Sequence, residues 1–120
     1  MAISHAYPGI PVDLRPAGGS LSEAKSAALV KDESFEAIRM VIPKGHELSR
    51  HQTEGAITIY CLDGRIAFTA GEKTHDLKAG HWLFLLGNEP HSLVGIEDSS
   101  MLLTIIFPSE GRDSRLRMSE

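Results

Sequence analysis

Histidines are the residues of this chain best suited to chemistry, because an imidazole titrates near neutral pH and binds transition metals. No two of the six stand four residues apart as in a helical zinc site, and no Cys-x-x-Cys pair occurs. Four are most simply surface or loop residues: His5, His46, His75 and His81. His51 precedes an apolar segment and His91 opens another. In a barrel, these two side chains could face a common pocket.

Short apolar segments rich in β-branched residues must position these histidines. They cover residues 37–42, 56–62, 65–70, 82–86, 91–96 and 101–107. Turn-forming residues separate them, at Pro43-Lys44-Gly45, Asp63-Gly64, Gly71-Glu72, Ala79-Gly80, Gly87-Asn88 and Asp98-Ser99. Asp63-Gly64 predicts a tight hairpin, because glycine tolerates the positive φ of such turns. Short strands at this spacing predict an all-β sandwich or barrel.

Both ends of the chain differ from this pattern. Residues 1–20 hold Pro8, Pro11 and Pro16 and predict an extended N-terminal arm. Residues 108–120 are polar and predict a flexible tail, which leaves 21–107 for the barrel. Ser20-Leu21-Ser22-Glu23 resembles a helix capping box, so we expect a short helical turn that leads into a strand around residues 28–31.

Composition limits the classes of function. A chain of 120 residues suits one domain. Its net charge of −4, without clustered Lys and Arg, argues against nucleic-acid and membrane partners. The single Cys61 cannot form an internal disulfide, which fits a reducing compartment. Neither a signal peptide nor an apolar run of about 18 residues is present. We expect a soluble, cytoplasmic protein.

Two segments resemble the two sequence motifs of the cupin superfamily. Gly45-His46-Glu47-Leu48-Ser49-Arg50-His51, followed by Leu62-Asp63-Gly64, is similar to the first motif. Residues 77–93, with a glycine turn, an apolar strand and Pro90-His91, are similar to the second. The resemblance implies a short single-domain cupin, an all-β jelly-roll barrel with an extended N-terminal arm. It also implies a homodimer, since cupins often dimerise through their sheets.

The resemblance further implies a metal site, from which this chain departs. Cupin sites commonly use a His-x-His, a glutamate a few residues later and the histidine of the second motif. His51 and His91 match the outer members of that set. Thr53 stands in place of the second histidine, and Ala56 or Ile57 in place of the glutamate. Two of four expected ligands are therefore missing.

The missing ligands leave the cofactor open. Two neutral imidazoles do not offset the charge of a cation, and a catalytic site usually has three protein ligands. Glu54 is a candidate third ligand, although it has the opposite strand parity from His51. The prediction is either no cofactor or one divalent transition metal (Zn, Fe, Mn or Ni) held by His51 and His91. Alternatively, both are partly buried imidazoles hydrogen-bonded to their neighbours.

The expected pocket is mainly apolar. If alternate residues face inward, Ile57, Ile59 and Cys61 line the lumen below a polar mouth. The predicted ligand-binding set is then His51, Thr53, Ile57, Ile59, Cys61 and His91. Such a lining suits a small, partly hydrophobic molecule. We expect a small-molecule-binding or sensing protein. The alternatives are a metal-dependent enzyme of the dioxygenase or isomerase sort and a structural or assembly module.

Overall fold

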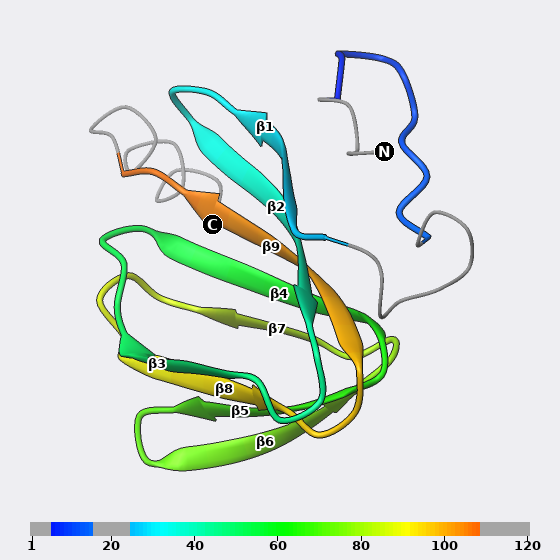
Figure 1. Cartoon of the computed structure of the whole chain (residues 1–120). Helices are drawn as coiled ribbons and strands as arrows, with labels where there is room; N and C mark the ends of the chain where they lie inside the picture. Colours follow the sequence, from blue (N-terminus) through cyan, green and yellow to red (C-terminus); the bar gives the residue numbers. More distant parts are fainter. Residues whose placement is uncertain (1–5, 16–24, 109–120) are drawn as a thin grey trace.

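The structure, a computed structural model, describes residues 6–15 and 25–108 (Figure 1). These residues form strands and loops without a helix. The strands are β1 (Ala27–Lys31), β2 (Phe35–Ile42), β3 (Glu47–His51), β4 (Ala56–Asp63), β5 (Arg65–Ala70), β6 (Lys73–Lys78), β7 (Trp82–Leu85), β8 (His91–Gly95) and β9 (Ser99–Ile106). The helical turn expected at Ser20–Glu23, and the tail beyond Pro108, lie outside the described residues.

The strands form two antiparallel sheets that face each other (Figure 1). One has five strands in the order β1-β2-β9-β4-β7, and the other has four in the order β3-β8-β5-β6. Strands that are far apart in the sequence, such as β2 and β9, are neighbours in one sheet, as in a jelly roll. The predicted all-β jelly-roll barrel is confirmed.

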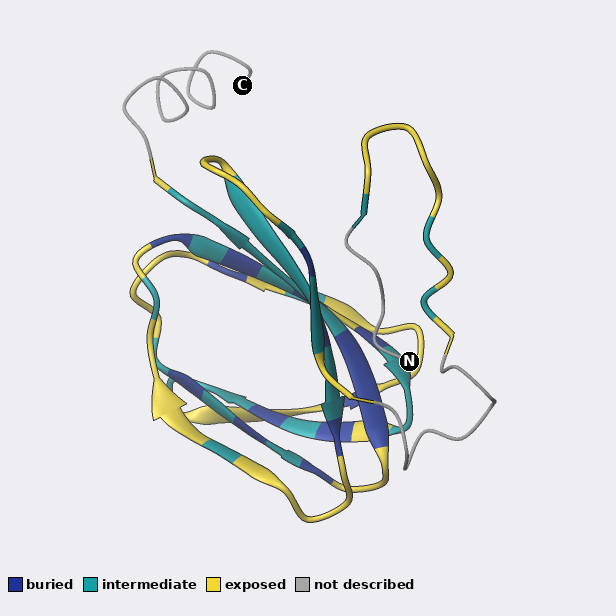
Figure 2. Cartoon of the chain, turned by 45° about the horizontal axis from the view of Figure 1, so that its top comes forward, coloured by how far each residue is buried: buried dark blue, intermediate teal, exposed yellow. Residues whose placement is uncertain are grey.

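The core lies between the sheets (Figure 2), and along β4 and β5 it contains alternate residues. Ile57 is opposite Ile105 and Ile59 is opposite Leu103, so these four side chains share the inner face of the five-stranded sheet. From the other sheet, Ile66, Phe68 and Leu93 complete the centre of the core. The period-two alternation of the sequence thus decides which side of each strand is buried.

Gly64 occupies a corner between the sheets. We expected a hairpin at Asp63-Gly64, and this prediction is wrong, because β4 pairs with β7 and β9 whereas β5 pairs with β6 and β8. Gly64 has φ 81°, and a Cβ there would overlap the Asp98 carbonyl and the Ser99 hydroxyl. The glycine signal marks a sharp change of direction, but it does not specify which strands pair.

β3 and β6 were not predicted as strands. They are the two edges of the four-stranded sheet, and each contributes little to the core. In β6 Leu77 alone is buried, and in β3 Leu48 is half-buried while the other residues are exposed. An edge strand with one face in solvent carries a polar sequence, so its apolar pattern is weak.

The described part of the N-terminal arm, residues 6–15, forms no strand and lies along β1 and β2. The Ala6 amide donates to the Leu29 carbonyl at 2.8 Å. Nη1 of Arg39, a buried residue of β2, donates to the carbonyls of Leu14 and Arg15, each at 3.3 Å. These contacts hold the arm against the side of the barrel on which Arg39 lies.

Candidate functional site

His51 and His91 meet at one end of the barrel. His51 is the last residue of β3, His91 is the first of β8, and the two are cross-strand partners. Their ring centroids are 4.3 Å apart, and the ring planes cross at 64°. The structure therefore brings together the two histidines that the sequence singled out.

A bulge in β3 makes this meeting possible. Leu48 is opposite Leu93 and His51 is opposite His91, so three residue steps on β3 match two steps on β8. Without the extra residue, Leu48 and His51 would point to opposite faces of the sheet, because side chains alternate along a strand. A bulge re-aims the side chains that follow it. The bulge therefore places His51 on the same face as His91.

Both imidazoles are fixed in the same way by the backbone two residues earlier. The Nδ1 of His51 lies 2.9 Å from the Ser49 carbonyl, and the Nδ1 of His91 lies 2.9 Å from the Glu89 carbonyl. A carbonyl only accepts hydrogen bonds, so each Nδ1 carries the proton and donates it. In the neutral rings, both Nε2 atoms then keep a free lone pair. In this tautomer, Nε2 can accept a hydrogen bond or bind a metal ion.

His91 and His51 differ in their environments. His91 is only 6% exposed, and its ring stacks on Phe68 with centroids 5.8 Å apart, whereas His51 is exposed. Burial lowers the pKa of His91, and the neighbouring His51 acts in the same direction. The hydrogen bond to the Glu89 carbonyl opposes this shift. Near neutral pH the buried member of the pair is therefore a neutral ring that can accept a hydrogen bond.

The predicted lining residues Ile57, Ile59 and Cys61 face inward, as expected from their alternation. They are packed in the core, with exposures of 3%, 0% and 0%. The Cys61 thiol donates to the Asp63 carbonyl at 3.4 Å, and burial raises its pKa to about 11, as expected for an inert core thiol. At the level of Ile59 and Cys61 the barrel interior is filled by side chains. The accessible part of the site is therefore the end of the barrel where His51 and His91 lie, here called the mouth.

Thr53 and Glu54 lie in the loop between β3 and β4. The Thr53 hydroxyl donates to the Gly55 carbonyl at 3.0 Å, and the Thr53 carbonyl accepts from the Asn88 amide at 2.7 Å. Thr53 thus ties this loop to the loop after β7. Glu54 is exposed.

The donor set at the mouth does not fit a three-ligand metal centre. Within residues 6–15 and 25–108, no three His, Cys, Asp or Glu side chains are grouped closely enough to hold a metal ion. Glu54 therefore does not complete a set with His51 and His91. The two Nε2 atoms are suitable ligands, but two neutral nitrogens alone neither fill the coordination sphere nor balance the charge of a divalent cation.

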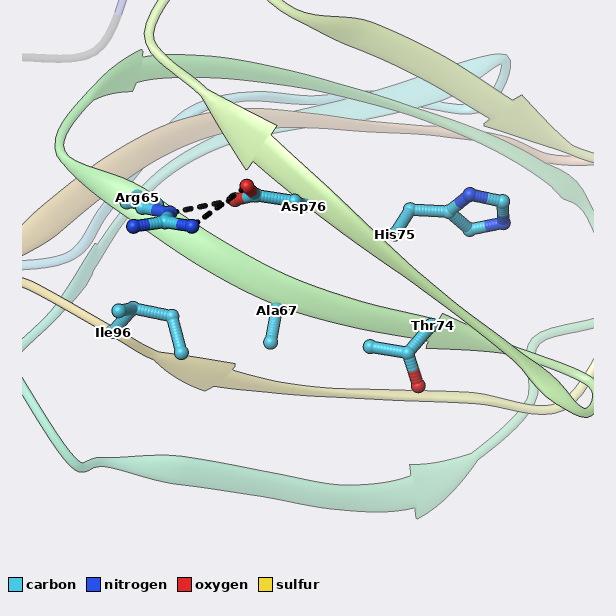
Figure 3. A pocket seen from close by; sticks show the side chains of 6 residues that line it. All are labelled: Arg65, Ala67, Thr74, His75, Asp76 and Ile96. Carbon is cyan, nitrogen blue, oxygen red and sulfur yellow. Dashed lines mark hydrogen bonds and ion pairs between the residues drawn. The ribbon is translucent and has the colours of Figure 1, made fainter.

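A second feature, which sequence reasoning missed, is a shallow hollow of about 250 Å³ on the outer face of the four-stranded sheet (Figure 3). It is lined by Arg65, Ala67, Thr74, His75, Asp76 and Ile96. Arg65 donates to both Asp76 oxygens, at 2.8 and 2.9 Å, which holds the pKa of Asp76 below its usual value. The sequence showed that Arg65 and Ala67 alternate with core residues. The hollow, however, is also lined by residues of β6, and this strand could not be predicted because its sequence is mostly polar.

Comparison with known proteins agrees with this geometry. The family model described as "Cupin domain" matches residues 38–107, which is more than half of the chain, so the protein belongs to the cupin family. A search of curated proteins found no match.

Solved structures share the fold across most of the chain. A conserved protein of unknown function from Streptococcus pyogenes is 22% identical, with a TM-score of 0.74 over 91% of this chain and 96% of that one. A cupin superfamily protein from Desulfitobacterium hafniense is 18% identical, with a TM-score of 0.72 over 90% and 100%. The cupin domain of Cnp3 from Schizosaccharomyces pombe is 22% identical, with a TM-score of 0.67 over 82% and 80%. At these identities the likeness concerns the fold alone. In the described residues no helix is long and apolar enough to cross a membrane.

Proposed function

We propose that this cupin binds a small molecule at the barrel mouth through His51 and His91. The observation that carries the proposal is that both rings are held in the same way, each by a hydrogen bond from its Nδ1 to a backbone carbonyl. Side chains fixed in one rotamer and tautomer lose little entropy when a ligand binds. Two pre-oriented acceptor nitrogens on rings 4.3 Å apart form a compact recognition element.

The chemistry of the pair defines the ligand class. A neutral Nε2 accepts a hydrogen bond, so the ligand presents a donor such as a hydroxyl or an N–H group. Phe68 stacks on His91, and Ala70 is its cross-strand partner, so the surroundings of the buried ring are apolar. Because the interior below is filled, the ligand lies at the mouth and not deep in the lumen. A small, partly hydrophobic alcohol or amine fits these conditions.

A divalent transition metal is the second candidate for the same pair. Two Nε2 lone pairs can hold Zn²⁺, Fe²⁺, Mn²⁺ or Ni²⁺ weakly and exchangeably, with water or a ligand in the remaining positions. Because the described residues provide no third protein ligand, we place binding or sensing ahead of metal-dependent catalysis.

A fragment screen followed by amide NMR tests the proposal. The full-length protein is exposed to small alcohols, amines and carboxylates, and separately to Zn²⁺. We expect shifts that centre on residues 49–51, 68 and 89–91 for donors, with little effect from carboxylates. His51→Ala and His91→Gln should each weaken binding at least about tenfold, the effect of one lost hydrogen bond. His75→Ala, at an exposed histidine, is the matched control. Hits whose shifts centre elsewhere, or that bind both variants normally, would contradict the proposal.

A further inference from the structure

Arg39 is a buried cation on the outer face of β2, away from the core. It is only 2% exposed, and its Nη1 donates to the carbonyls of Leu14 and Arg15 in the N-terminal arm. Both distances are 3.3 Å, which is long for a hydrogen bond from nitrogen to oxygen. Backbone carbonyls carry partial charges only, so they do not balance the guanidinium. Burying a charge without a partner of opposite sign is costly, and Arg39 therefore lacks an anion.

One edge of the Arg39 guanidinium is open. Its Nε is buried and has no hydrogen-bond partner, and within residues 6–15 and 25–108 no acceptor contacts its Nη2. The N–H groups of Nε and Nη2 lie along one edge of the planar group, and this edge matches the two oxygens of a carboxylate. The arm thus holds the guanidinium through Nη1 and leaves its carboxylate-binding edge unfilled.

Two other arginines of the chain use the same edge to bind a carboxylate. In Arg65, Nε and Nη2 donate to the two oxygens of Asp76 at 2.8 and 2.9 Å (Figure 3). In Arg15, Nε and Nη2 donate to Asp13 at 3.0 and 2.7 Å. Both of these ion pairs are exposed, so water also solvates their charges. Arg39 is shielded from water, and its open edge has the greater need of an anion.

The chain's described carboxylates do not supply this anion. Within the described ranges, no Asp or Glu side chain forms an ion pair with Arg39. Asp13, in the arm itself, is bonded to Arg15. Asp63, which follows the outer row of β4, accepts a hydrogen bond from the Ser100 hydroxyl at 2.7 Å. Both aspartates of this side of the barrel are therefore engaged with other residues.

Apolar side chains continue from Arg39 across the sheet. Its cross-strand partners are Ala27 on β1 and Leu102 on β9, and the row extends through Tyr60 to Trp82. Exposure rises along the row, from the half-buried Leu102 to Tyr60 at 39% and Trp82 at 58%. Neighbouring strands are about 4.8 Å apart, so Tyr60 lies about 10 Å from Arg39 along the row. A buried cation and an open apolar surface thus adjoin each other.

We propose that the open edge of Arg39 binds the carboxylate of a small amphipathic acid, whose apolar body lies over Leu102 and Tyr60. The head of such an acid complements the buried charge, and the low dielectric of the surroundings strengthens their attraction. The body adds the free energy of covering apolar surface. A single guanidinium pairs with a single negative charge, which favours a monocarboxylate. This site lies on the outside of the barrel and is separate from the mouth.

The arm controls access to the site. Its described hydrogen bonds to the barrel are few: the Ala6 amide donates to the Leu29 carbonyl, and Arg39 donates to the two arm carbonyls. A segment held by so few hydrogen bonds opens locally at little cost, which admits a small acid but no folded partner. Since the ligand and the arm occupy different nitrogens of Arg39, the arm closes again over the bound carboxylate.

Hexanoate is the probe, because its six carbons span roughly the distance from Arg39 to Tyr60. It is titrated into the full-length protein from about 0.1 to about 10 mM and followed by amide NMR, in the range of weak binding. We expect shifts that centre on residues 14–15, 27, 39, 60 and 102. Methyl hexanoate, which has the same body without the charge, should leave these amides in place. Acetate, which has the head alone, should bind at least about tenfold more weakly.

Arg39→Gln removes the charge and should weaken hexanoate binding at least about tenfold. Arg50→Gln, at an exposed arginine of the other sheet, is the matched control and should bind hexanoate normally. Far-UV circular dichroism verifies that both variants fold, and the comparison of hexanoate with its ester needs no variant. At the mouth, carboxylates should still have little effect, so the two sites are tested independently.

Three results would each overturn the proposal. The first is the absence of hexanoate shifts in the wild type, which would mean that the edge is filled by the chain's own carboxylates or stays unfilled. The second is equal shifts from hexanoate and methyl hexanoate, which would show that the head is not recognised. The third is undiminished hexanoate binding by a folded Arg39→Gln variant, which would place the acid elsewhere on the protein.

Discussion

His51 and His91 stand opposite each other on β3 and β8, and each donates its Nδ1 proton to the carbonyl two residues earlier in the chain. The two rings, on two different strands, are thus held by the same kind of hydrogen bond to the local backbone. In this arrangement both Nε2 atoms lie at the mouth of the barrel without a described hydrogen-bond partner. This arrangement is the basis for the proposed binding of a small molecule.

Protonation of His91 should destabilise the fold. The pKa of His91 in the folded protein is below the usual value of 6.5, so the folded protein binds fewer protons than the unfolded chain as pH falls through that value. The loss of stability from protonating His91 is absent above the pKa of the unfolded chain and complete below the pKa of the folded protein. We expect the free energy of unfolding, measured in urea, to decline from about pH 8 to about pH 5. His91→Phe, which keeps an aromatic ring on Phe68, should flatten this decline.

The control for this prediction is His75→Gln, at an exposed histidine, which should keep the pH dependence of the wild type. Equal slopes for the wild type and His91→Phe would show that His91 is not the group responsible.

Cys61 should react only when the protein unfolds. The thiolate is the nucleophile, and burial raises the pKa of Cys61 from 9.0 to about 11, which lowers the thiolate fraction roughly 100-fold at pH 8. Mass spectrometry after iodoacetamide treatment should therefore find the native protein unlabelled while the urea-unfolded chain is modified. Comparable labelling rates in the two states would mean that the interior around Cys61 is open, contrary to a filled core.

Gly64 and Gly80 separate two costs of replacing a glycine. Both have positive φ, 81° and 93°, so an alanine at either position costs about 1–3 kcal/mol for the backbone conformation. A Cβ at Gly80 meets nothing within 4 Å, whereas at Gly64 it overlaps the Asp98 carbonyl and the Ser99 hydroxyl. Gly64→Ala should thus destabilise the protein in urea unfolding clearly more than Gly80→Ala. Equal losses would argue against the close approach of β9 to this corner.

The sequence predicted the fold where the apolar pattern is strong. Buried central strands such as β4 and β9 alternate clearly, and they lie within one residue or two of the expected ranges. β3 and β6 were not predicted as strands because edge strands bury one or two side chains and are otherwise polar. The hairpin expected at Asp63-Gly64 was wrong because a turn residue reports local φ, whereas pairing depends on which sheet buries the following strand.

The candidate site was predictable only in part. The resemblance of two motifs selected His51 and His91, and strand alternation placed Ile57, Ile59 and Cys61 inward. The bulge that turns His51 toward His91 has no signal in the segment Leu48 to His51, because its position depends on the partner strand β8. The packing that fills the barrel at Ile59 depends on side chains from both sheets, which alternation along one strand does not reveal.

The most direct test of the proposed site is ¹⁵N NMR of the histidine ring nitrogens, with and without a fragment that binds. In the free protein near neutral pH, we expect His91 to be neutral, with its proton on Nδ1 and a lone pair on Nε2, as the contact to the Glu89 carbonyl requires. On binding of a hydrogen-bond donor, the Nε2 resonances of both His51 and His91 should shift while those of His75 stay in place. A proton on Nε2 of His91 in the free protein, or Nε2 resonances that no bound fragment moves, would contradict the proposed binding site.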